Sequence, residues 1–113
     1  MHEQSLTEKV LRIVLAEARH HQARQVTKVT LTVGELSGIV PESVELFFQI
    51  LAAETAAAGA KLEFKIAKAL LFCPCCQTQF DKRSGDFFCP SCGGLGRLTD
   101  AGREFQVESI EIE

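Results

Sequence analysis

The sequence predicts an α+β fold in which two helices lie on a small mixed three-stranded sheet, with a metal-binding ribbon inserted before the last strand. Apolar residues repeat with helical spacing in two segments and alternate with polar residues in three others. Two C-x-x-C sequences lie between the second and third of these strands, in a segment too short to build a core of its own. The chain of 113 residues is long enough for one domain with a ribbon attached.

The first helix is predicted close to the N-terminus and is expected to end within 20–25. Ser5 to Glu8 fits a capping box, in which two side chains satisfy the free N–H groups of a helix start. His20 and His21 fall at the helix end, where positive charge is favourable, and are expected to be solvated rather than to bind metal. The residues expected to face the core share one helical stripe: Leu6, Val10, Ile13 and Val14.

A half-buried strand and a second helix follow. Val29, Leu31 and Val33 alternate with polar residues, and Gly34 ends this strand. Pro41 suits the first turn of a helix, and an alanine-rich tail is expected to carry that helix to Gly59. Its apolar stripe, expected to be core, consists of Val44, Phe47, Phe48 and Leu51.

A second strand is predicted from the alternation of Leu62, Phe64 and Ile66, and it is expected to run through 70–72 directly into the first cysteine pair. The last strand covers about 104–112. Its alternation slips, which predicts a β-bulge near 108–109 that turns the apolar residues of both halves inward. These are Phe105, Val107, Ile110 and Ile112. We therefore expect an α+β domain of residues 1–68 plus 101–113 and a zinc-ribbon domain of residues 69–100.

The cysteine pairs predict a structural zinc site. Each pair is spaced as C-x-x-C, and 12 residues separate the pairs, an arrangement that places four thiolates around one tetrahedral centre. The stretch 88–94 is expected to form a tight turn whose N–H groups point at the sulfur atoms. The predicted ligands are Cys73, Cys76, Cys89 and Cys92.

Other interpretations of these thiols remain open. Two disulfides or a redox C-x-x-C do not explain both the doubling and the spacing of the pairs. Iron also accepts four thiolates in tetrahedral geometry and would make an electron-transfer protein with visible colour. Cys75 lies inside the first pair and could be a fifth ligand or a reactive thiol, but it is expected to be a bystander, because the two pairs already supply four donors.

The first three residues form a second candidate metal site. Met1 is expected to be retained because His2 is too large for the usual removal of an initiator methionine. The terminal amine, the amides of His2 and Glu3 and the His2 imidazole then form a flat nitrogen-donor set that suits Ni(II) or Cu(II). The Glu3 carboxylate could add a hydrogen bond or an axial oxygen. From the residues alone, a histidine at position 2 without any function is the commoner case.

Four separated motifs together resemble the HypA/HybF family, the nickel metallochaperones of nickel–iron hydrogenase maturation. They are Met1-His2-Glu3 before an amphipathic helix, Val33-Gly34-Glu35-Leu36-Ser37 at a strand end, the cysteine ribbon, and the final Ser109-Ile110-Glu111-Ile112-Glu113. The resemblance runs from the first residue to the last. It implies that His2 is the essential nickel ligand, with Met1 and Glu3 as further donors, and that the four cysteines hold zinc.

The resemblance also implies two protein partners. The GTPase HypB would be one partner, and the nickel–iron hydrogenase large subunit would receive the nickel. The alternative is a zinc-ribbon interaction or regulatory module in which the N-terminus is inert. Nickel titration of the untagged protein separates the two.

Composition excludes several other classes. The net charge of −3 provides no electrostatic footprint for nucleic acid. No apolar run approaches the length of a membrane span, and no export leader is recognisable, so reduced thiols in the cytoplasm are expected. No nucleophile–base set or phosphate-binding loop is recognisable either, so the chain is not expected to be an enzyme.

Overall fold

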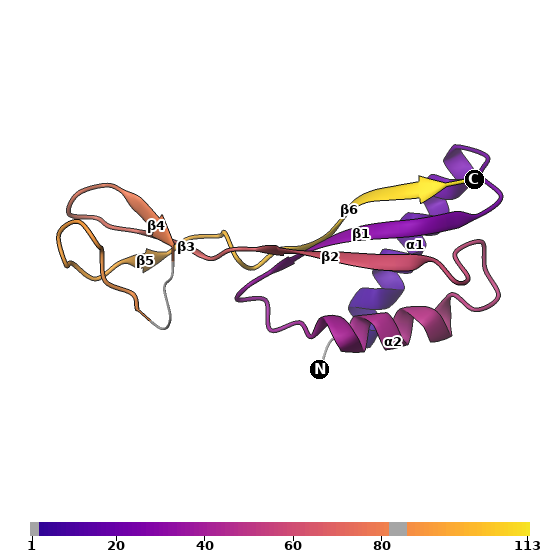
Figure 1. The fold of residues 1–113 in the computed structure, drawn as a ribbon, viewed down its shortest axis with the longest axis horizontal. Helices are drawn as coiled ribbons and strands as arrows, with labels where there is room; N and C mark the ends of the chain where they lie inside the picture. The colour runs from indigo at the N-terminus through magenta and orange to yellow at the C-terminus, as the bar shows by residue number, and fades with distance from the viewer. Residues whose placement is uncertain (1–2, 82–85) are drawn as a thin grey trace.

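The computed structural model describes residues 3–81 and 86–113 and confirms the predicted fold class. The molecule is 54 Å long and 27 Å wide, with an α+β part at one end and a ribbon at the other (Figure 1). In chain order the elements are α1 (Glu3–His20), β1 (Val26–Gly34), α2 (Pro41–Leu51), β2 (Lys61–Ala67), β3 (Leu70–Phe72), β4 (Gln79–Asp81), β5 (Arg97–Leu98) and β6 (Phe105–Ile112).

The larger sheet is mixed, with the strand order β2-β1-β6. β1 and β2 are parallel and are joined through α2, whereas β6 returns from the ribbon and pairs with β1 in the antiparallel direction. The core lies between the two helices and one face of this sheet, because the helical stripes and the alternating strand residues are apolar on these sides. Its fully buried side chains include Val14, Val29, Leu31, Val44 and Phe48.

The predicted bulge in the last strand is present. Thr30 pairs with Ser109 and Leu31 pairs with Val107, so Glu108 is the extra residue on β6. Because of this extra residue, Phe105, Val107 and Ile110 all pack against the core. Ile112 does not follow the prediction, since it lies at the open end of the strand and is 38% exposed.

Two details of α1 differ from the sequence prediction. The helix already includes Glu3, so Ser5 to Glu8 is not its cap, and the Thr7 hydroxyl donates instead to the Glu3 carbonyl inside the helix. Ile13 is 51% exposed, and Leu11 is buried in its place. The buried stripe is thus rotated from the predicted one, because α1 packs against both α2 and the sheet.

α2 begins at Pro41 as predicted but ends at Leu51, well before Gly59. The alanine-rich tail folds back instead, since the Thr55 hydroxyl donates to the Ala52 carbonyl and also accepts from the Ala57 N–H. Ala57 is fully buried in this turn. Phe47, predicted to be core, is only half-buried.

The ribbon has its own small sheet, with the order β4-β3-β5. Leu70–Phe72, predicted to continue the second strand, is therefore the central strand of a different sheet. The backbone leaves the larger sheet after Ala67, and β3 pairs with β4 and β5 in the antiparallel direction.

Three segments meet between the two sheets and form a closely packed joint: residues 34–36 at the end of β1, and residues 67–69 and 102–104, which connect the two sheets. The Gly34 N–H donates to the Glu104 carbonyl at 2.6 Å, and the Glu35 N–H donates to the Ala67 carbonyl at 2.8 Å. The Glu35 carboxylate accepts the Ala69 N–H at 2.8 Å. The joint is thus hydrogen-bonded through backbone groups of all three segments.

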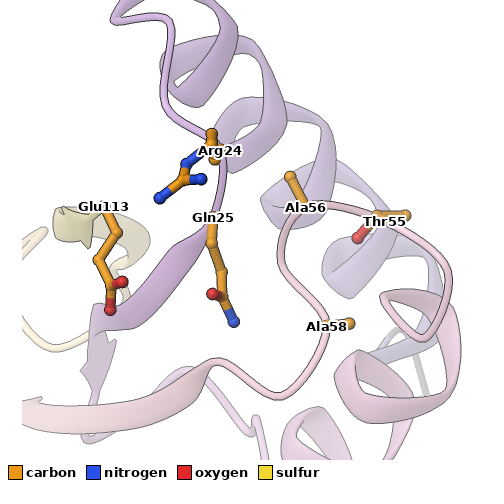
Figure 2. A pocket seen from close by; sticks show the side chains of 6 residues that line it. All are labelled: Arg24, Gln25, Thr55, Ala56, Ala58 and Glu113. Atoms are coloured by element: carbon orange, nitrogen blue, oxygen red, sulfur yellow. The ribbon is translucent and has the colours of Figure 1, made fainter.

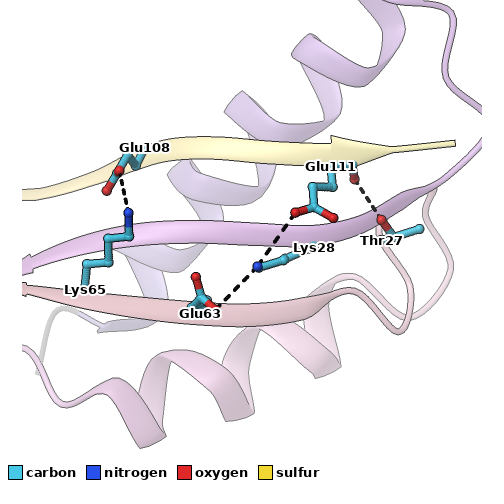
Figure 3. A network of polar contacts seen from close by, with 6 residues as sticks. All are labelled: Thr27, Lys28, Glu63, Lys65, Glu108 and Glu111. Carbon is cyan, nitrogen blue, oxygen red and sulfur yellow. Dashed lines mark hydrogen bonds and ion pairs between the residues drawn. The ribbon is translucent and has the colours of Figure 1, made fainter.

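The open face of the larger sheet carries charges in place of apolar residues. Lys28 lies 3.4 Å from Glu63 on β2 and 3.7 Å from Glu111 on β6, and Lys65 lies 3.0 Å from Glu108 (Figure 3). These pairs connect all three strands on the side away from α1. Because they are solvent-exposed, each contributes little to stability, but they explain why this face needs no covering layer.

We expect Gly34→Ala to destabilise the protein by about 2 kcal/mol or more, because a Cβ at position 34 would lie 2.2 Å from the Gly102 carbonyl oxygen. Gly38→Ala is the matched control. Position 38 has a left-handed backbone with φ of +75° but open space around it, so only a conformational cost of about 1 kcal/mol is expected. Urea unfolding measures both variants, and equal losses would contradict a steric role for Gly34.

We expect the pKa of Glu108 to lie below its ordinary value of 4.5, first because Lys65 donates a hydrogen bond to its carboxylate and second because the Thr32 hydroxyl does so. The stability that this bulge residue provides is therefore present above pH 4.5 and lost as the pH falls through the lower folded-state pKa. NMR titration of the Glu108 carboxyl should show this low value in the wild type and a rise in Lys65→Met. An unchanged pKa in Lys65→Met would disprove the pairing.

Candidate metal centre

The four cysteines predicted to bind metal lie together in the ribbon. Their sulfur atoms all lie within 4.8 Å of one another. Cys73 and Cys92 approach to 3.4 Å between sulfur atoms, and Cys76 and Cys89 to 3.5 Å. In a tetrahedron with metal–sulfur bonds of ~2.3 Å, the sulfur atoms are about 3.8 Å apart. The cluster therefore has the size of a tetrathiolate metal site.

Two turns of the same design hold these thiols. In each, the N–H of the first cysteine donates to the carbonyl five residues later, at 2.9 Å for Cys73 and 2.7 Å for Cys89. The N–H four residues later donates back to the cysteine carbonyl, at 2.8 Å in both turns. That position has a left-handed backbone in both, with φ of 59° at Gln77 and 77° at Gly93. The repeated C-P-x-C pattern thus gives the same local structure twice.

Backbone N–H groups point at the sulfur atoms, as expected from the sequence. The Cys92 N–H, followed by that of Ser91, lowers the pKa of Cys89 to about 6. The Cys76 N–H likewise lowers the pKa of Cys73, which is fully buried. Donors aimed at sulfur favour the thiolate, which is the form that binds metal.

Cys92 shows the opposite effect. The Gly94 N–H favours its thiolate, but the neighbouring Cys73 thiol, burial, and the thiols of Cys76 and Cys89 together outweigh that donor and raise the pKa of Cys92 to about 12. Thiolates packed this closely repel one another, so they do not all ionise without a cation between them. A divalent metal supplies the compensating charge, and the donor set thus fits the zinc expected from the sequence.

Cys75 lies near the cluster but outside the set of four. It is exposed, and its sulfur atom would lie 3.8 Å from a Cβ built at Gly94, as would that of Cys73. None of the five cysteines forms a disulfide. The sequence expectation that Cys75 is a bystander agrees with this arrangement.

The N-terminal candidate site is described only in part. Met1 and His2 lie outside the described residues. Glu3 is the first residue of α1 and is only 8% exposed, and one oxygen of its carboxylate accepts the Val40 N–H at 3.4 Å. Val40 is the N-cap residue of α2, and its apolar side chain forms no capping hydrogen bond. The Glu3 carboxylate therefore interacts with the start of α2, where the helix dipole favours an anion.

The histidines at the end of α1 lie apart from both candidate sites. His20 and His21 are exposed, their rings meet edge to face, and His21 lies 3.5 Å from Glu17. They are among the exposed groups of the α1 end, as the sequence predicts.

A cavity of 390 Å³ lies at the end of the larger sheet opposite the ribbon (Figure 2). It is formed where the loop after α1 and the turn after α2 meet the C-terminal residue. The N–H groups of Arg24 and Gln25 donate to the Glu113 carbonyl at its rim. No sequence motif predicted it, and none of the described residues that line it is a cysteine or a histidine. These residues are Arg24, Gln25, Thr55, Ala56, Ala58 and Glu113.

Known proteins match the chain along its whole length. The model of one protein family, described as "Hydrogenase/urease nickel incorporation, metallochaperone, hypA", matches residues 1–112. The chain belongs to the HypA family. HypA proteins are metallochaperones, that is, maturation factors rather than catalytic enzymes.

Two relatives illustrate the match. Hydrogenase maturation factor HypA of Caldanaerobacter subterraneus subsp. tengcongensis is 46% identical over 114 residues, covering 100% of both chains. HypA of Dehalococcoides mccartyi strain 195 is 40% identical, covering 100% of this chain and 95% of the relative.

Solved structures show the same fold. The solution structure of the nickel metallochaperone HypA from Helicobacter pylori has a TM-score of 0.69 at 24% identity, covering 99% of this chain and 97% of that chain. A second HypA solution structure has a TM-score of 0.75 and also 24% identity, covering 100% of this chain and 97% of that chain.

Among the described residues, neither helix has the length and apolar character of a membrane span.

We expect Cys89→Ser to abolish metal binding by the cluster, because it removes one of four donors from a closed site. Cys75→Ser is the matched control and should leave one metal ion per chain. Elemental analysis of the purified variants measures both. Full metal content in Cys89→Ser, or its loss in Cys75→Ser, would show that a different set of thiols binds the metal.

Proposed function

We propose that this HypA protein binds Ni(II) at its N-terminus and delivers it to the nickel–iron hydrogenase large subunit during maturation. The observation that carries the proposal is the family match over residues 1–112, which includes the predicted donor set of Met1, His2 and Glu3. The His2 imidazole, the terminal amine and the amides of His2 and Glu3 would be the nickel donors.

The surroundings of Glu3 support a nitrogen-donor site. Its carboxylate accepts a hydrogen bond from Val40, so this side chain has a partner other than a metal ion. The contact attaches the first turn of α1 to the N-terminal end of α2. We infer that the carboxylate holds the N-terminal segment in place, while the backbone of the same residue contributes a donor.

We propose further that the four clustered cysteines hold a structural Zn(II). The repeated turns and the sulfur–sulfur distances support this proposal. Zinc bound there would stabilise the ribbon, which has little core of its own. Residues 69–100 would then form a zinc-ribbon domain attached to a nickel-binding domain of residues 1–68 and 101–113.

The proposed setting is the cytoplasm, with two protein partners. The GTPase HypB would act with this protein, and the hydrogenase large subunit would receive the nickel. The names of the curated relatives, hydrogenase maturation factor HypA, support this role. The alternative is a ribbon-based interaction module without nickel, and the following experiment separates the two.

We expect His2→Ala to abolish Ni(II) binding while metal in the cysteine cluster and the fold persist. Amide nitrogens bind Ni(II) only when deprotonated, so wild-type affinity should fall more steeply with decreasing pH than an imidazole of pKa ~6.5 alone would allow. Calorimetric nickel titration of the untagged protein at several pH values measures this. A planar complex should also show weak yellow d–d absorption.

Two controls separate the donors. One residue added before Met1 should weaken nickel binding, because it converts the terminal amine into an amide while leaving the imidazole unchanged. His20→Ala combined with His21→Ala should change little. Nickel bound at one ion per chain in His2→Ala would contradict the N-terminal site and leave the interaction module as the better explanation.

A further inference from the structure

β2 lies at the edge of the larger sheet, and α2 runs beside it (Figure 1). The space between them is a groove of 380 Å³, lined by Pro41, Glu42, Glu45, Leu62 and Phe64. Neither the proposed nickel site nor the cysteine cluster uses these residues. The groove is therefore separate from both proposed metal sites.

The β2 side of the groove is apolar. Three alternate residues of β2 share the side that faces α2, and their exposure rises along the strand. Leu62 is 8% exposed, Phe64 is half-buried, and Ile66 is 58% exposed. Leu46 of α2, which follows the groove residue Glu45 in the chain, is 60% exposed. Exposed aliphatic side chains gathered beside a groove are typical of a surface that binds another chain.

The wall formed by α2 is acidic. Glu42 and Glu45 both line the groove, and neither forms an ion pair with the other residues that the structure describes. One carboxylate oxygen of Glu45 is buried and has no hydrogen-bond partner there. A buried carboxylate oxygen without a donor is unfavourable, so a ligand that brings a cationic donor gains energy at this position.

We propose that this groove binds an extended segment of a partner protein, which adds to β2 as a further strand and places a lysine or arginine beside Glu45. An edge strand offers unpaired backbone groups, and a groove beside it selects the side chains at alternate positions of the added strand. The residues two positions before and after the basic one would share its face of the added strand and would be aliphatic, to match Leu62, Phe64 and Ile66.

The other edge of the sheet has a different character. A groove of 240 Å³ lies between α1 and β6, but Lys9 is its only charged lining residue among those that the structure describes. Its apolar lining includes Leu6, Val10, Ile13, Phe105 and Val107. A basic segment would be repelled there and attracted to the β2 groove. Charge therefore distinguishes the two edges, and the proposal applies to β2 alone.

The β2 groove also begins near the N-terminal segment. Pro41 lines it, and the preceding Val40 donates its N–H to the Glu3 carboxylate. If the N-terminus binds nickel, a point that rests on the proposed function, a segment in this groove would lie close to the metal. The recognition itself does not depend on nickel, so the two hypotheses can fail independently.

The test uses the untagged, zinc-loaded full chain without nickel. It is immobilised and screened against acetylated, amidated heptapeptides with threonine at alternate positions and all residues except cysteine at the other three. We expect enrichment of lysine or arginine at one varied position, with valine, isoleucine or leucine beside it. In NMR titrations with the ¹⁵N-labelled protein, the selected peptide should shift amides of β2 and of the first turns of α2, and leave those of β6 unchanged.

Glu45→Gln should weaken the selected peptide by about tenfold or more, the loss expected for a hydrogen bond to a charged group. Glu54→Gln, an exposed position beyond α2, is the matched control and should leave the affinity unchanged. An extended peptide presents its N–H groups alternately on two edges, and the proposal pairs one of these edges with β2. N-methylation of the amides on that edge should abolish binding, whereas N-methylation on the other edge should not. A library without binders, binders without a basic residue, shifts at β6, or equal affinity for Glu45→Gln would each overturn the proposal. If two peptides, each methylated on one edge, both still bind, the proposal is overturned as well.

Discussion

The close approach of backbone at Gly34 and Gly102 is the constraint on which the arrangement of the molecule depends. A Cβ at either position would collide with the neighbouring segment, at 2.2 Å from the Gly102 carbonyl oxygen in one case and 2.7 Å from the Ala69 Cα in the other. Gly102 also has φ of +95°, which L side chains rarely adopt. Glycine at these two positions lets the end of β1 and the two connections between the sheets meet at this spacing. The ribbon is therefore attached through a hydrogen-bonded joint and not through a flexible linker.

The joint also gives a structural reason for the motif Val33-Gly34-Glu35-Leu36-Ser37. Val33 is buried at the end of β1, Gly34 permits the backbone contact, and Glu35 accepts the Ala69 N–H just before β3 begins. A carboxylate at the start of the ribbon thus satisfies a backbone donor that neither sheet pairs. Changes in the ribbon, such as loss of the proposed metal, would act on the larger sheet through these few contacts.

Much of this structure could be predicted from the sequence, because local chemistry decides it. Pro41 fixes the start of α2, the broken alternation of β6 locates the bulge at Glu108, and the C-x-x-C pairs predict the sulfur cluster. Features set by distant neighbours could not be predicted. The end of α2 depends on how Thr55 and Ala57 fold back, and the exposure of Ile13 depends on the angle at which α1 packs. The partner of Gly34 lies in a segment far along the chain.

The two proposed metal sites place opposite demands on the protein, and the fold separates them accordingly. A structural zinc needs a closed donor set, and the ribbon provides one through paired turns that aim N–H groups at buried thiolates. A transferable metal needs a site that opens at little cost, and the first residues of a chain have few contacts to lose. Glu3 marks the boundary, because its carboxylate interacts with the start of α2 while its backbone amide and the two residues before it would bind the nickel. The same contact connects that segment to the end of α2 where the acidic groove begins, so a partner bound there would act on the part of the chain that must release its metal.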